Sequence, residues 1–342
     1  MQTDCKASYP PMRSLVLFVC LLISLALLLL SCGGGSGSSG TSPGDCNFQT
    51  GGNCSISVSG ANRSYVLHIP PGFQANSSAL VIALHGSQWS GAQMESISGL
   101  SNKADRVGFA VAYPDALKSD QGHTLWSVFY NDFAFSRTPP DDVTFLRQLI
   151  NTLQANIHPD PKKIYVAGFS IGGYMAHRAG VQLSGLVAAI GVVEGTLYAI
   201  ESTDGRTVPA SVAPVSVLII HGDQDSAIPY CGSNTASRSE SSQEQTFNYW
   251  TSGLGDNCSI LDTTAPLCDS QGNITAVMEK DATHCRSNTE VKFYKLAGGV
   301  HTWYNTAMNI PGQVPYNPKL SNSTGIFTDD VLWNFFAAHR KP

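Results

Sequence analysis

One short stretch near the middle of the chain constrains its fold more than any other. Residues 163–169 are mostly apolar. This run ends in Gly168-Phe169-Ser170-Ile171-Gly172, and a helical pattern follows it. Gly-x-Ser-x-Gly between a strand and a helix is the form of a nucleophile elbow, whose glycines let the two elements cross closely. A second match, Gly40-Thr41-Ser42-Pro43-Gly44, lies in a Gly/Ser-rich linker. Only Ser170 has a strand before it and a helix after it, so it is the candidate nucleophile.

Apolar runs alternate with helical patterns through the rest of the chain. Continuous apolar runs, which are typical of buried parallel strands, cover residues 79–84, 109–114, 186–193 and 215–220. Helical patterns cover residues 93–107, 171–183 and 328–339. This alternation predicts an α/β fold with a mostly parallel central sheet and helices on both faces. The chain has 342 residues, of which 42% are hydrophobic, so one large core is expected in a catalytic domain over 46–342.

The first 32 residues have the pattern of a targeting segment. Lys6 and Arg13 precede an apolar run over 15–30, and Cys32 follows it. The pattern is similar to a bacterial lipoprotein signal peptide, in which Cys32 becomes the acylated first residue. The run is short for a membrane-spanning helix, which needs about 20 residues, although an uncleaved anchor is the alternative. Residues 33–45 form a Gly/Ser-rich linker. We therefore expect an exported protein. It is either a cell-envelope lipoprotein, which by analogy with other lipoproteins lies in the outer membrane, or an extracellular protein.

Cysteine usage agrees with export. After the leader, six cysteines remain, and an oxidising compartment would let them form up to three disulfides. The preferred pairings are Cys46–Cys54, from proximity, and two guesses, Cys258–Cys285 and Cys231–Cys268. None of these cysteines shows C-x-x-C spacing, so we expect no metal site. The net charge of −5 gives no electrostatic argument for a nucleic-acid partner. We expect a monomer that binds its ester substrate and contacts a membrane only through the lipid.

Two further segments are candidates for the surroundings of Ser170. The apolar run over 79–84 ends in His85-Gly86-Ser87, where the backbone N–H of Ser87 is a candidate oxyanion donor together with that of Ile171. His85 itself is interpreted as structural. Residues 122–140 are rich in aromatic side chains, including Trp126, and either pack into the core or line a pocket. Asp141 and Asp142 then suit a helix N-terminus better than an acid–base pair.

Two more strand ends complete a catalytic set. Asp225 follows the run over 215–220, and His301 follows a strand over 291–296 through a Gly-rich turn. The carboxyl ends of parallel strands meet at one edge of a sheet, so Ser170, Asp225 and His301 should converge there. Their chain order is that of the α/β-hydrolase triad, in which the histidine acts as base and the aspartate orients it.

Alternative residues exist for two of these roles. Asp223 could replace Asp225 as the acid, but it is closer to the strand end and could instead brace the loop. His284 and His339 also follow Asp225, but neither leaves a strand through a Gly-rich turn. His177 lies two turns along the helix after Ser170 and is interpreted as structural.

The chain resembles the extracellular polyhydroxybutyrate depolymerase and feruloyl esterase branch of the α/β-hydrolases. The resemblance covers residues 60 to 305 and rests on the following stretches: Leu84-His85-Gly86, Trp126, Asp141-Asp142-Val143, 165–175, 221–225, Ile228-Pro229-Tyr230 and Val300-His301-Thr302-Trp303. It implies a carboxylic-ester hydrolase without cofactor that uses Ser170, Asp225 and His301. Members commonly have a Trp-rich stretch around Trp126 and often a Cys at the position of Ser87. These differences leave the reaction class intact and the substrate open.

The predicted function is therefore hydrolysis of a carboxylic ester through an acyl-enzyme. The expected substrates are hydroxyalkanoate esters or feruloyl or acetyl esters of plant polysaccharide, with Trp126 and Trp303 as an apolar wall for the acyl group. One alternative is a serine peptidase of the same fold. Another is a non-catalytic lipoprotein that binds polysaccharide or polyester.

Overall fold

A central ten-stranded β-sheet organises the part of the chain that the structure describes. The computed structural model describes residues 46–128, 140–198, 208–235, 238–268, 274–304 and 327–341. The strands of the sheet are β1 (Gly51–Val58), β2 (Ala61–His68), β3 (Leu80–Leu84), β4 (Ala110–Pro114), β7 (Ile164–Phe169), β8 (Ala189–Val193), β9 (Ser216–Gly222), β12 (Ile260–Cys268), β13 (Ile274–Thr283) and β14 (Val291–Leu296). Two small hairpins lie outside it: β5 (Leu117–Lys118) with β6 (Thr124–Leu125), and β10 (Ser233–Thr235) with β11 (Arg238–Glu240).

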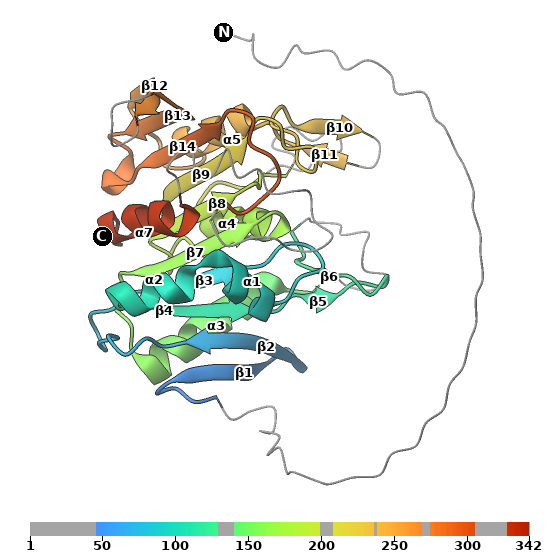
Figure 1. Ribbon diagram of the computed structural model, residues 1–342, viewed down its shortest axis with the longest axis vertical. Coiled ribbons are helices and arrows are strands. Elements are labelled where there is room, and N and C mark those ends of the chain that lie inside the picture. The colour runs from blue at the N-terminus through green and yellow to red at the C-terminus, as the bar shows by residue number, and fades with distance from the viewer. Residues whose placement is uncertain are drawn as a thin grey trace, which may run out of the picture. The chain divides into compact units, whose positions relative to one another are not determined.

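The strand order is β1-β2-β4-β3-β7-β8-β9-β14-β13-β12 (Figure 1). The six strands from β4 to β14 are parallel, and the two strands at each edge pair antiparallel with their neighbours. Every residue of β3, β4, β7, β8 and β9 is buried, because helices cover both faces of a parallel sheet. The predicted mostly parallel sheet is therefore confirmed.

Helices cover both faces of this sheet. They are α1 (Gly91–Ser98), α2 (Leu100–Val107), α3 (Asp142–Ile157), α4 (Ile171–Gln182), α5 (Gln243–Thr251), α7 (Thr328–Ala338) and the short 3-10 helix η1 (Arg286–Asn288). On one face α1, α2 and α7 contribute to a core that contains Phe109 and Phe336. On the other face α3, α4 and α5 contribute to a core that contains Leu146 and Trp250. The sheet thus separates two apolar layers.

Two elements differ from the sequence prediction. The single helix expected over 93–107 is two helices, because Gly99 lies between them with a left-handed φ of 73° that ends α1. No strand was predicted within residues 256–284, but they supply β12 and β13, which extend the sheet. Edge strands face solvent in part, so they lack the continuous apolar run that identified the central strands.

The disulfides follow the predicted pairings where they are described. Cys46 bonds Cys54, and Cys258 bonds Cys285. Cys231 is also disulfide-bonded, but the side chain of its predicted partner Cys268 lies outside the described residues. These bonds fit an oxidising compartment.

Several predicted features lie outside the described residues. They are the leader with Cys32, the whole linker over 33–45, and residues 129–139 of the aromatic segment. Within the described ranges, no helix combines the length and the apolar character needed to cross a membrane.

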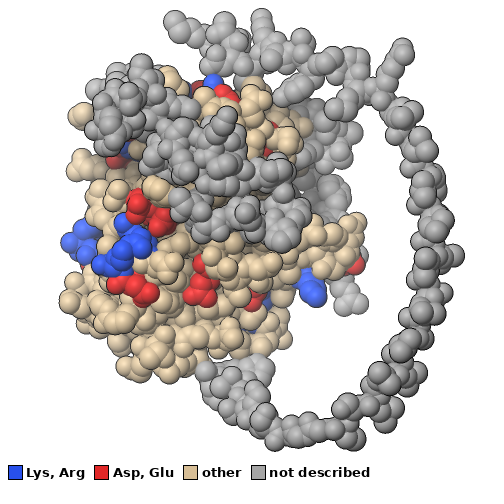
Figure 2. Space-filling view, viewed as in Figure 1, with Lys and Arg blue, Asp and Glu red and all other residues tan. Residues whose placement is uncertain are grey.

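Charged side chains are sparse on the surface. On the face that Figure 2 shows, basic and acidic side chains lie beside one another. Charged residues make up 13% of the chain, about half the usual share, so uncharged polar residues cover much of the surface.

Candidate active site

Ser170 lies on a tight turn between β7 and the first residue of α4. Its φ of 55° and ψ of −123° fall in a region that side chains other than glycine rarely adopt. A Cβ atom at Gly168 would overlap the carbonyl of Gly172, and one at Gly172 would overlap the carbonyl of Leu84. Only glycine fits at these two positions. The close crossing of β7, α4 and the end of β3 holds Ser170 in this strained geometry, as in a nucleophile elbow.

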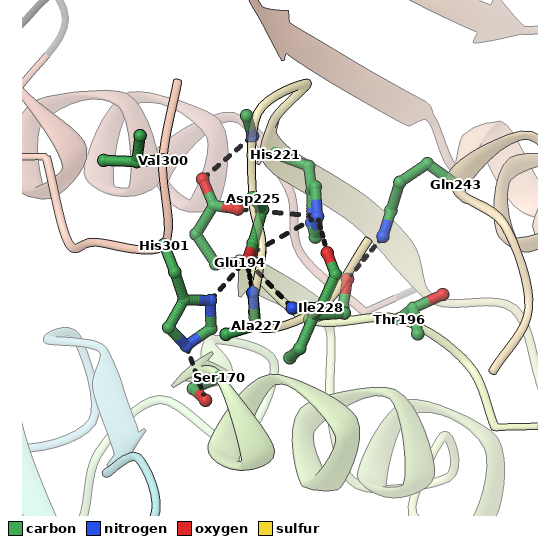
Figure 3. Close-up of polar contacts among 12 residues, drawn as sticks. Ser170, Glu194, Thr196, His221, Asp225, Ala227, Ile228, Gln243, Val300 and His301 are labelled. Carbon is green, nitrogen blue, oxygen red and sulfur yellow. Dashed lines mark hydrogen bonds and ion pairs between the residues drawn. The ribbon is translucent and has the colours of Figure 1, made fainter. Parts of the chain in front are cut away.

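A chain of hydrogen bonds joins Ser170 to two other predicted residues (Figure 3). The distance from Ser170 Oγ to His301 Nε2 is 2.9 Å, and from His301 Nδ1 to Asp225 Oδ2 it is 2.7 Å. The side chain of His301 is 16% exposed, whereas that of Asp225 is fully buried. The structure thus brings together all three side chains predicted for catalysis, in the order serine, histidine, aspartate.

The loops that carry Asp225 and His301 are fixed to each other. They leave the parallel neighbours β9 and β14, which end side by side. The Gln224 N–H donates to the Gly299 carbonyl at 2.9 Å, and the Gly298 N–H donates to Asp223 Oδ1 at 2.7 Å. Asp223 therefore braces the loop, the role that sequence analysis gave it as the alternative to the catalytic acid.

Asp225 is held as a buried carboxylate. Its Oδ1 accepts from the N–H groups of Ala227 and Ile228 at 2.7 and 2.8 Å. Burial opposes the charge, but the hydrogen bond from His301 and the charge of that histidine outweigh it, and the pKa of Asp225 falls to about 2. Asp225 is therefore ionised at neutral pH and orients the Nδ1–H of His301.

A second buried carboxyl group, which sequence analysis missed, lies beside Asp225. Glu194 follows β8 directly, and its Oε1 accepts from the Gly222 N–H at 2.9 Å and the Tyr304 hydroxyl at 2.5 Å. His221, at the end of β9, has its Nε2 2.9 Å from the Ile228 carbonyl. Burial lowers the pKa of His221 to about 4, so this ring is neutral. The available signal was the position of Glu194, a charged residue directly after a buried strand.

The His85-Gly86-Ser87 turn lies against the elbow. A Cβ atom built on Gly86 would be 3.5 Å from Ser170 Cβ, so this turn passes next to the nucleophile. The His85 ring is buried, its Nε2 accepts from the Ala116 N–H at 3.0 Å, and its Nδ1 lies 2.7 Å from the Gly86 carbonyl. His85 thus shapes the turn and takes the structural place that was predicted for it.

Comparison with known proteins agrees with this geometry. Residues 63–204 match the family model described as Esterase PHB depolymerase. The protein NocK of Nocardia uniformis subsp. tsuyamanensis, whose name proposes an esterase, is 28% identical over 285 residues, which are 79% of this chain and 77% of NocK. Feruloyl esterase B of Piromyces equi is 33% identical over 171 residues, 50% of this chain. That match spans only 30% of the Piromyces protein.

Among solved structures, the acetyl xylan esterase from Aspergillus awamori aligns with a TM-score of 0.54 and 16% identity, over 80% of this chain and 94% of its own. This likeness concerns the fold. The fold is that of the α/β-hydrolases, and the chain is similar to their polyhydroxybutyrate depolymerase and feruloyl esterase branch. The predicted resemblance and fold class are thereby confirmed.

Two tryptophans of this α/β-hydrolase lie differently from the prediction. Trp126 and Trp303 were expected to form a wall for the substrate, but both are fully buried. The Trp126 Nε1–H donates to the His85 carbonyl at 3.0 Å, and the Trp303 Nε1–H donates to the Ser98 carbonyl at 3.1 Å. A buried indole needs a partner for its N–H, and both find one on the backbone. Trp126 therefore supports the turn beside Ser170 instead of presenting an exposed surface.

Phe169 links Trp303 to the hydrolase site. Its ring centroid lies 5.1 Å from that of His301 and 6.4 Å from that of Trp303. Trp89 stacks on Phe169 at 5.1 Å. These aromatic contacts pack Phe169 against the His301 ring.

The paired aspartates at the start of α3 serve the fold. Asp141 caps the helix by accepting from the Thr144 N–H at 2.9 Å. Asp142 is buried and pairs with Arg63 at 2.7 Å. The helix-terminal interpretation of this pair therefore agrees with the structure.

The other histidines considered as bases have their own partners. His177 is buried, and its Nδ1 accepts from the Trp250 Nε1–H at 3.1 Å. His339 Nε2 lies 3.1 Å from Glu290 Oε2. His284 is exposed, with its Nδ1 3.2 Å from Thr283 Oγ1. None of these contacts involves Ser170.

The acids and the histidine of the site also cluster as metal ligands can. In the part of the chain that the structure describes, Glu194, Asp225 and His301 each offer a ligand atom within 4.8 Å of the others. Both ring nitrogens of His301 already face a partner, Asp225 on one side and Ser170 on the other. This arrangement suits proton transfer between Ser170 Oγ and His301 Nε2, with Asp225 orienting the ring.

Proposed function

We propose that this protein is a serine esterase in which Ser170 is the nucleophile, His301 the general base and Asp225 the residue that orients His301. The observation that carries the proposal is the 2.9 Å contact between Ser170 Oγ and His301 Nε2, continued by the 2.7 Å contact to Asp225. A serine hydroxyl is a weak nucleophile until a base within hydrogen-bonding distance takes its proton. The family match and the esterase names of the relatives support the same reaction class.

The reaction would proceed in two steps. In the first, Ser170 Oγ attacks the ester carbonyl carbon while His301 Nε2 takes the hydroxyl proton, and His301 then returns that proton to the leaving alcohol. In the second, His301 activates a water that hydrolyses the acyl-enzyme and frees Ser170. The buried charge of Asp225 stabilises the imidazolium that forms in both steps.

The backbone N–H groups of Ile171 and Ser87 would bind the oxyanion. Ile171 is the first residue of α4, where backbone N–H groups have no partner within the helix. Ser87 belongs to the turn that passes next to Ser170. Loss of one such donor typically raises the barrier by about 3–4 kcal/mol.

Hydrolysis of p-nitrophenyl acetate tests the reaction class. The protein without residues 1–32 should release p-nitrophenol, and Ser170→Ala should reduce the rate to that of the buffer. Ser127→Ala offers a matched control, because Ser127 is buried and its carbonyl, not its side chain, meets Arg178. Equal rates for the wild type and Ser170→Ala would overturn the esterase proposal.

The substrates that we propose are hydroxyalkanoate esters and feruloyl or acetyl esters of plant polysaccharide. The support is that the family model is named for polyhydroxybutyrate depolymerase, while a relative is named a feruloyl esterase and a structural neighbour an acetyl xylan esterase. A panel of hydroxybutyrate oligomer, feruloylated arabinoxylan and acetylated xylan would separate them. Release of hydroxybutyrate, ferulate or acetate identifies the acyl group, and release of none would remove all three classes.

We also propose that the enzyme is exported and anchored by a lipid on Cys32. The support comes from the leader, the Gly/Ser linker and the disulfides that an oxidising compartment permits. Expression in a bacterium supplied with labelled palmitate should label the full chain and leave Cys32→Ser unlabelled. Label on Cys32→Ser, or none on the wild type, would contradict the anchor.

A further inference from the structure

Glu194 lies in a fully buried position between the ends of β8 and β9. Its backbone N–H donates to the Ile220 carbonyl at 2.9 Å, and its φ is 48°. As described above, Oε1 accepts from Gly222 and Tyr304. The other oxygen, Oε2, is buried and has no hydrogen-bond partner among the described residues, because His221 Nε2, 3.5 Å away, faces the Ile228 carbonyl instead. A buried carboxylate oxygen without a donor is costly, so the state of this atom needs a physical explanation.

The neighbour that can satisfy Oε2 is the carboxyl group of Asp225. Ligand atoms of Glu194, Asp225 and His301 lie within 4.8 Å of one another, and Figure 3 draws the two acids side by side. The two carboxyl groups are close enough for a hydrogen bond if one of them carries a proton. Two ionised carboxylates at this separation would repel each other in a buried site, so a single proton between them is favoured.

The donors around the two acids decide which one keeps the proton. Asp225 accepts from two backbone N–H groups and from His301, and these bonds stabilise its charge. Glu194 has donors on one oxygen only. Burial, and then the adjacent Asp225, raise the pKa of Glu194 well above its ordinary value. The proton therefore resides on Glu194.

We propose that Glu194 is a positioning residue, a protonated acid that donates a hydrogen bond to Asp225 and holds that carboxylate against His301. This rests on the proposed function, because it assigns Glu194 to the support of the same three residues. With the bond from Glu194, each hydrogen-bonding direction of the Asp225 carboxylate is fixed by a neighbour. Asp225 then cannot rotate away when His301 moves its proton, and no second negative charge lies beside the base.

Among the described residues, the titratable groups that face Glu194 fit this assignment. Tyr304 donates to Glu194 and also contacts the Val300 carbonyl at 2.7 Å, and burial raises its pKa well above the ordinary value, so it stays neutral. His221 Nε2 lies 3.5 Å from Glu194 Oε2 and 3.6 Å from Asp225 Oδ2, and this ring is neutral as well. Asp225 is therefore the one fixed charge in the group at neutral pH.

Three variants test the proposal on the protein without residues 1–32. Glu194→Gln keeps a donor toward Asp225 and an acceptor toward Tyr304, but it cannot ionise. Glu194→Ala removes both. Glu244→Gln is the matched control, because Glu244 lies on α5, is 42% exposed and pairs with Lys280 at 2.7 Å.

The expected results separate protonation from positioning. Infrared difference spectra should show that Glu194→Gln loses the carbonyl band of a protonated carboxylic acid, and that Glu244→Gln does not. Glu194→Gln should keep kcat within threefold, with the acid limb of its pH–rate profile unmoved. Glu194→Ala should lower kcat on the order of 10- to 100-fold with KM nearly unchanged, which is the loss of a buried hydrogen bond to a charged group.

Two results would overturn the proposal. If Glu194 carried a negative charge, its removal in Glu194→Gln would disfavour protonation of the base and move the acid limb about one pH unit lower, with no carbonyl band lost. If Glu194→Ala kept the wild-type kcat, Glu194 would not position Asp225. Should Glu194→Ala not fold, the band and the pH profile of Glu194→Gln decide. If the wild type were no faster than Ser170→Ala, the esterase proposal would be refuted. The infrared band would still show whether Glu194 carries a proton.

Discussion

Asp225 and Asp223 lie two residues apart on one loop, yet their side chains do different things. Asp225 is buried against His301, whereas Asp223 accepts from the Gly298 N–H and ties two loops together. The first carboxylate contacts a ring that changes its protonation in the proposed reaction. The second contacts a backbone group that does not take part. Residue identity alone does not distinguish the two, but their geometry does.

Exchange of each aspartate for asparagine should therefore give unequal losses. Asp225→Asn can donate to His301 and so favours the wrong tautomer of the ring, and we expect kcat to fall roughly 10³- to 10⁴-fold, as in other serine triads. Asp223→Asn keeps an oxygen for the Gly298 N–H, so its kcat should stay within about threefold. Steady-state rates on p-nitrophenyl acetate measure both. A larger loss in Asp223→Asn would reverse the assignment of the acid.

At this scale, the sequence located residues that stand at the ends of apolar strands. Ser170, Asp225 and His301 were predicted because parallel strands end at one edge of the sheet. Glu194 was missed because only the fold shows that the ends of β8 and β9 are adjacent. Trp126 and Trp303 were placed in a substrate wall because aromatic residues suit both cores and pockets, and the sequence does not tell which way an indole points.

Among the elements, the contact between α4, β7 and the end of β3 fixes the site. Gly172 permits this contact because any Cβ there would overlap the carbonyls of Leu84 and His85. This contact thereby fixes the distance between β7, which precedes Ser170, and β3, which precedes the His85 turn. The elbow is thus a product of three elements and not of the pentapeptide alone.

Gly172→Ala should be strongly destabilising. The new methyl group must push two backbone carbonyls apart, and we expect the free energy of unfolding to fall by about 3 kcal/mol or more, as for other overpacked core positions. Gly185→Ala is the control, because a Cβ there meets nothing within 4 Å. Urea denaturation of the two variants measures the difference. Equal stability of the two would show that α4 can shift without cost.

The loop after α5 contains a further buried acid, Asp256. Its Oδ1 accepts from the Val215 N–H at 3.0 Å, ahead of β9, and burial raises its pKa to about 7. An acid whose pKa is higher in the folded state than in the unfolded state stabilises the fold while it is protonated. This contribution is complete below pH 4 and is lost as the pH rises toward 7.

Asp256→Asn should remove this pH dependence. The raised pKa of Asp256 corresponds to a decrease of at most about 4 kcal/mol in the free energy of unfolding between pH 4 and pH 7. We therefore expect the variant to gain stability relative to the wild type as the pH is raised from 5 to 8. Urea denaturation at both pH values gives the comparison. A constant difference between the two proteins would mean that Asp256 is ionised in the fold throughout.

Element boundaries were predicted best where burial is complete. β3, β4, β7, β8 and β9 have buried residues on both faces, so their sequences are continuous apolar runs. The strands β12 and β13 were not recognised because their sequences lack a continuous apolar run and contain polar residues as loops do. The break at Gly99 was missed because a single glycine is compatible with a helix interior and with a helix end.

For the whole molecule, the disulfides join parts of the chain that lie near the sheet edges. Cys46–Cys54 ties the first described residues to β1, which is the outermost strand on one side. Cys258–Cys285 ties the segment before β12 to the end of β13 on the other side. Neither bond contacts Ser170 or His301, so both should affect stability and leave the chemistry unchanged.

The two bonds should stabilise the enzyme by different amounts. Cys258 and Cys285 are 27 residues apart and Cys46 and Cys54 only 8, and a longer loop loses more entropy when the unfolded chain is closed. On this basis, replacement of both cysteines by alanine should cost about 3.5 kcal/mol for the longer loop and about 2.5 kcal/mol for the shorter one. Urea denaturation measures the loss, and kcat at 25 °C should match that of the wild type in both variants. If the shorter loop cost more, native contacts around β1 and not chain entropy would set the contribution of the bond. If kcat fell with the loss of Cys258–Cys285, the edge formed by β12 and β13 would act on the position of His301 through β14.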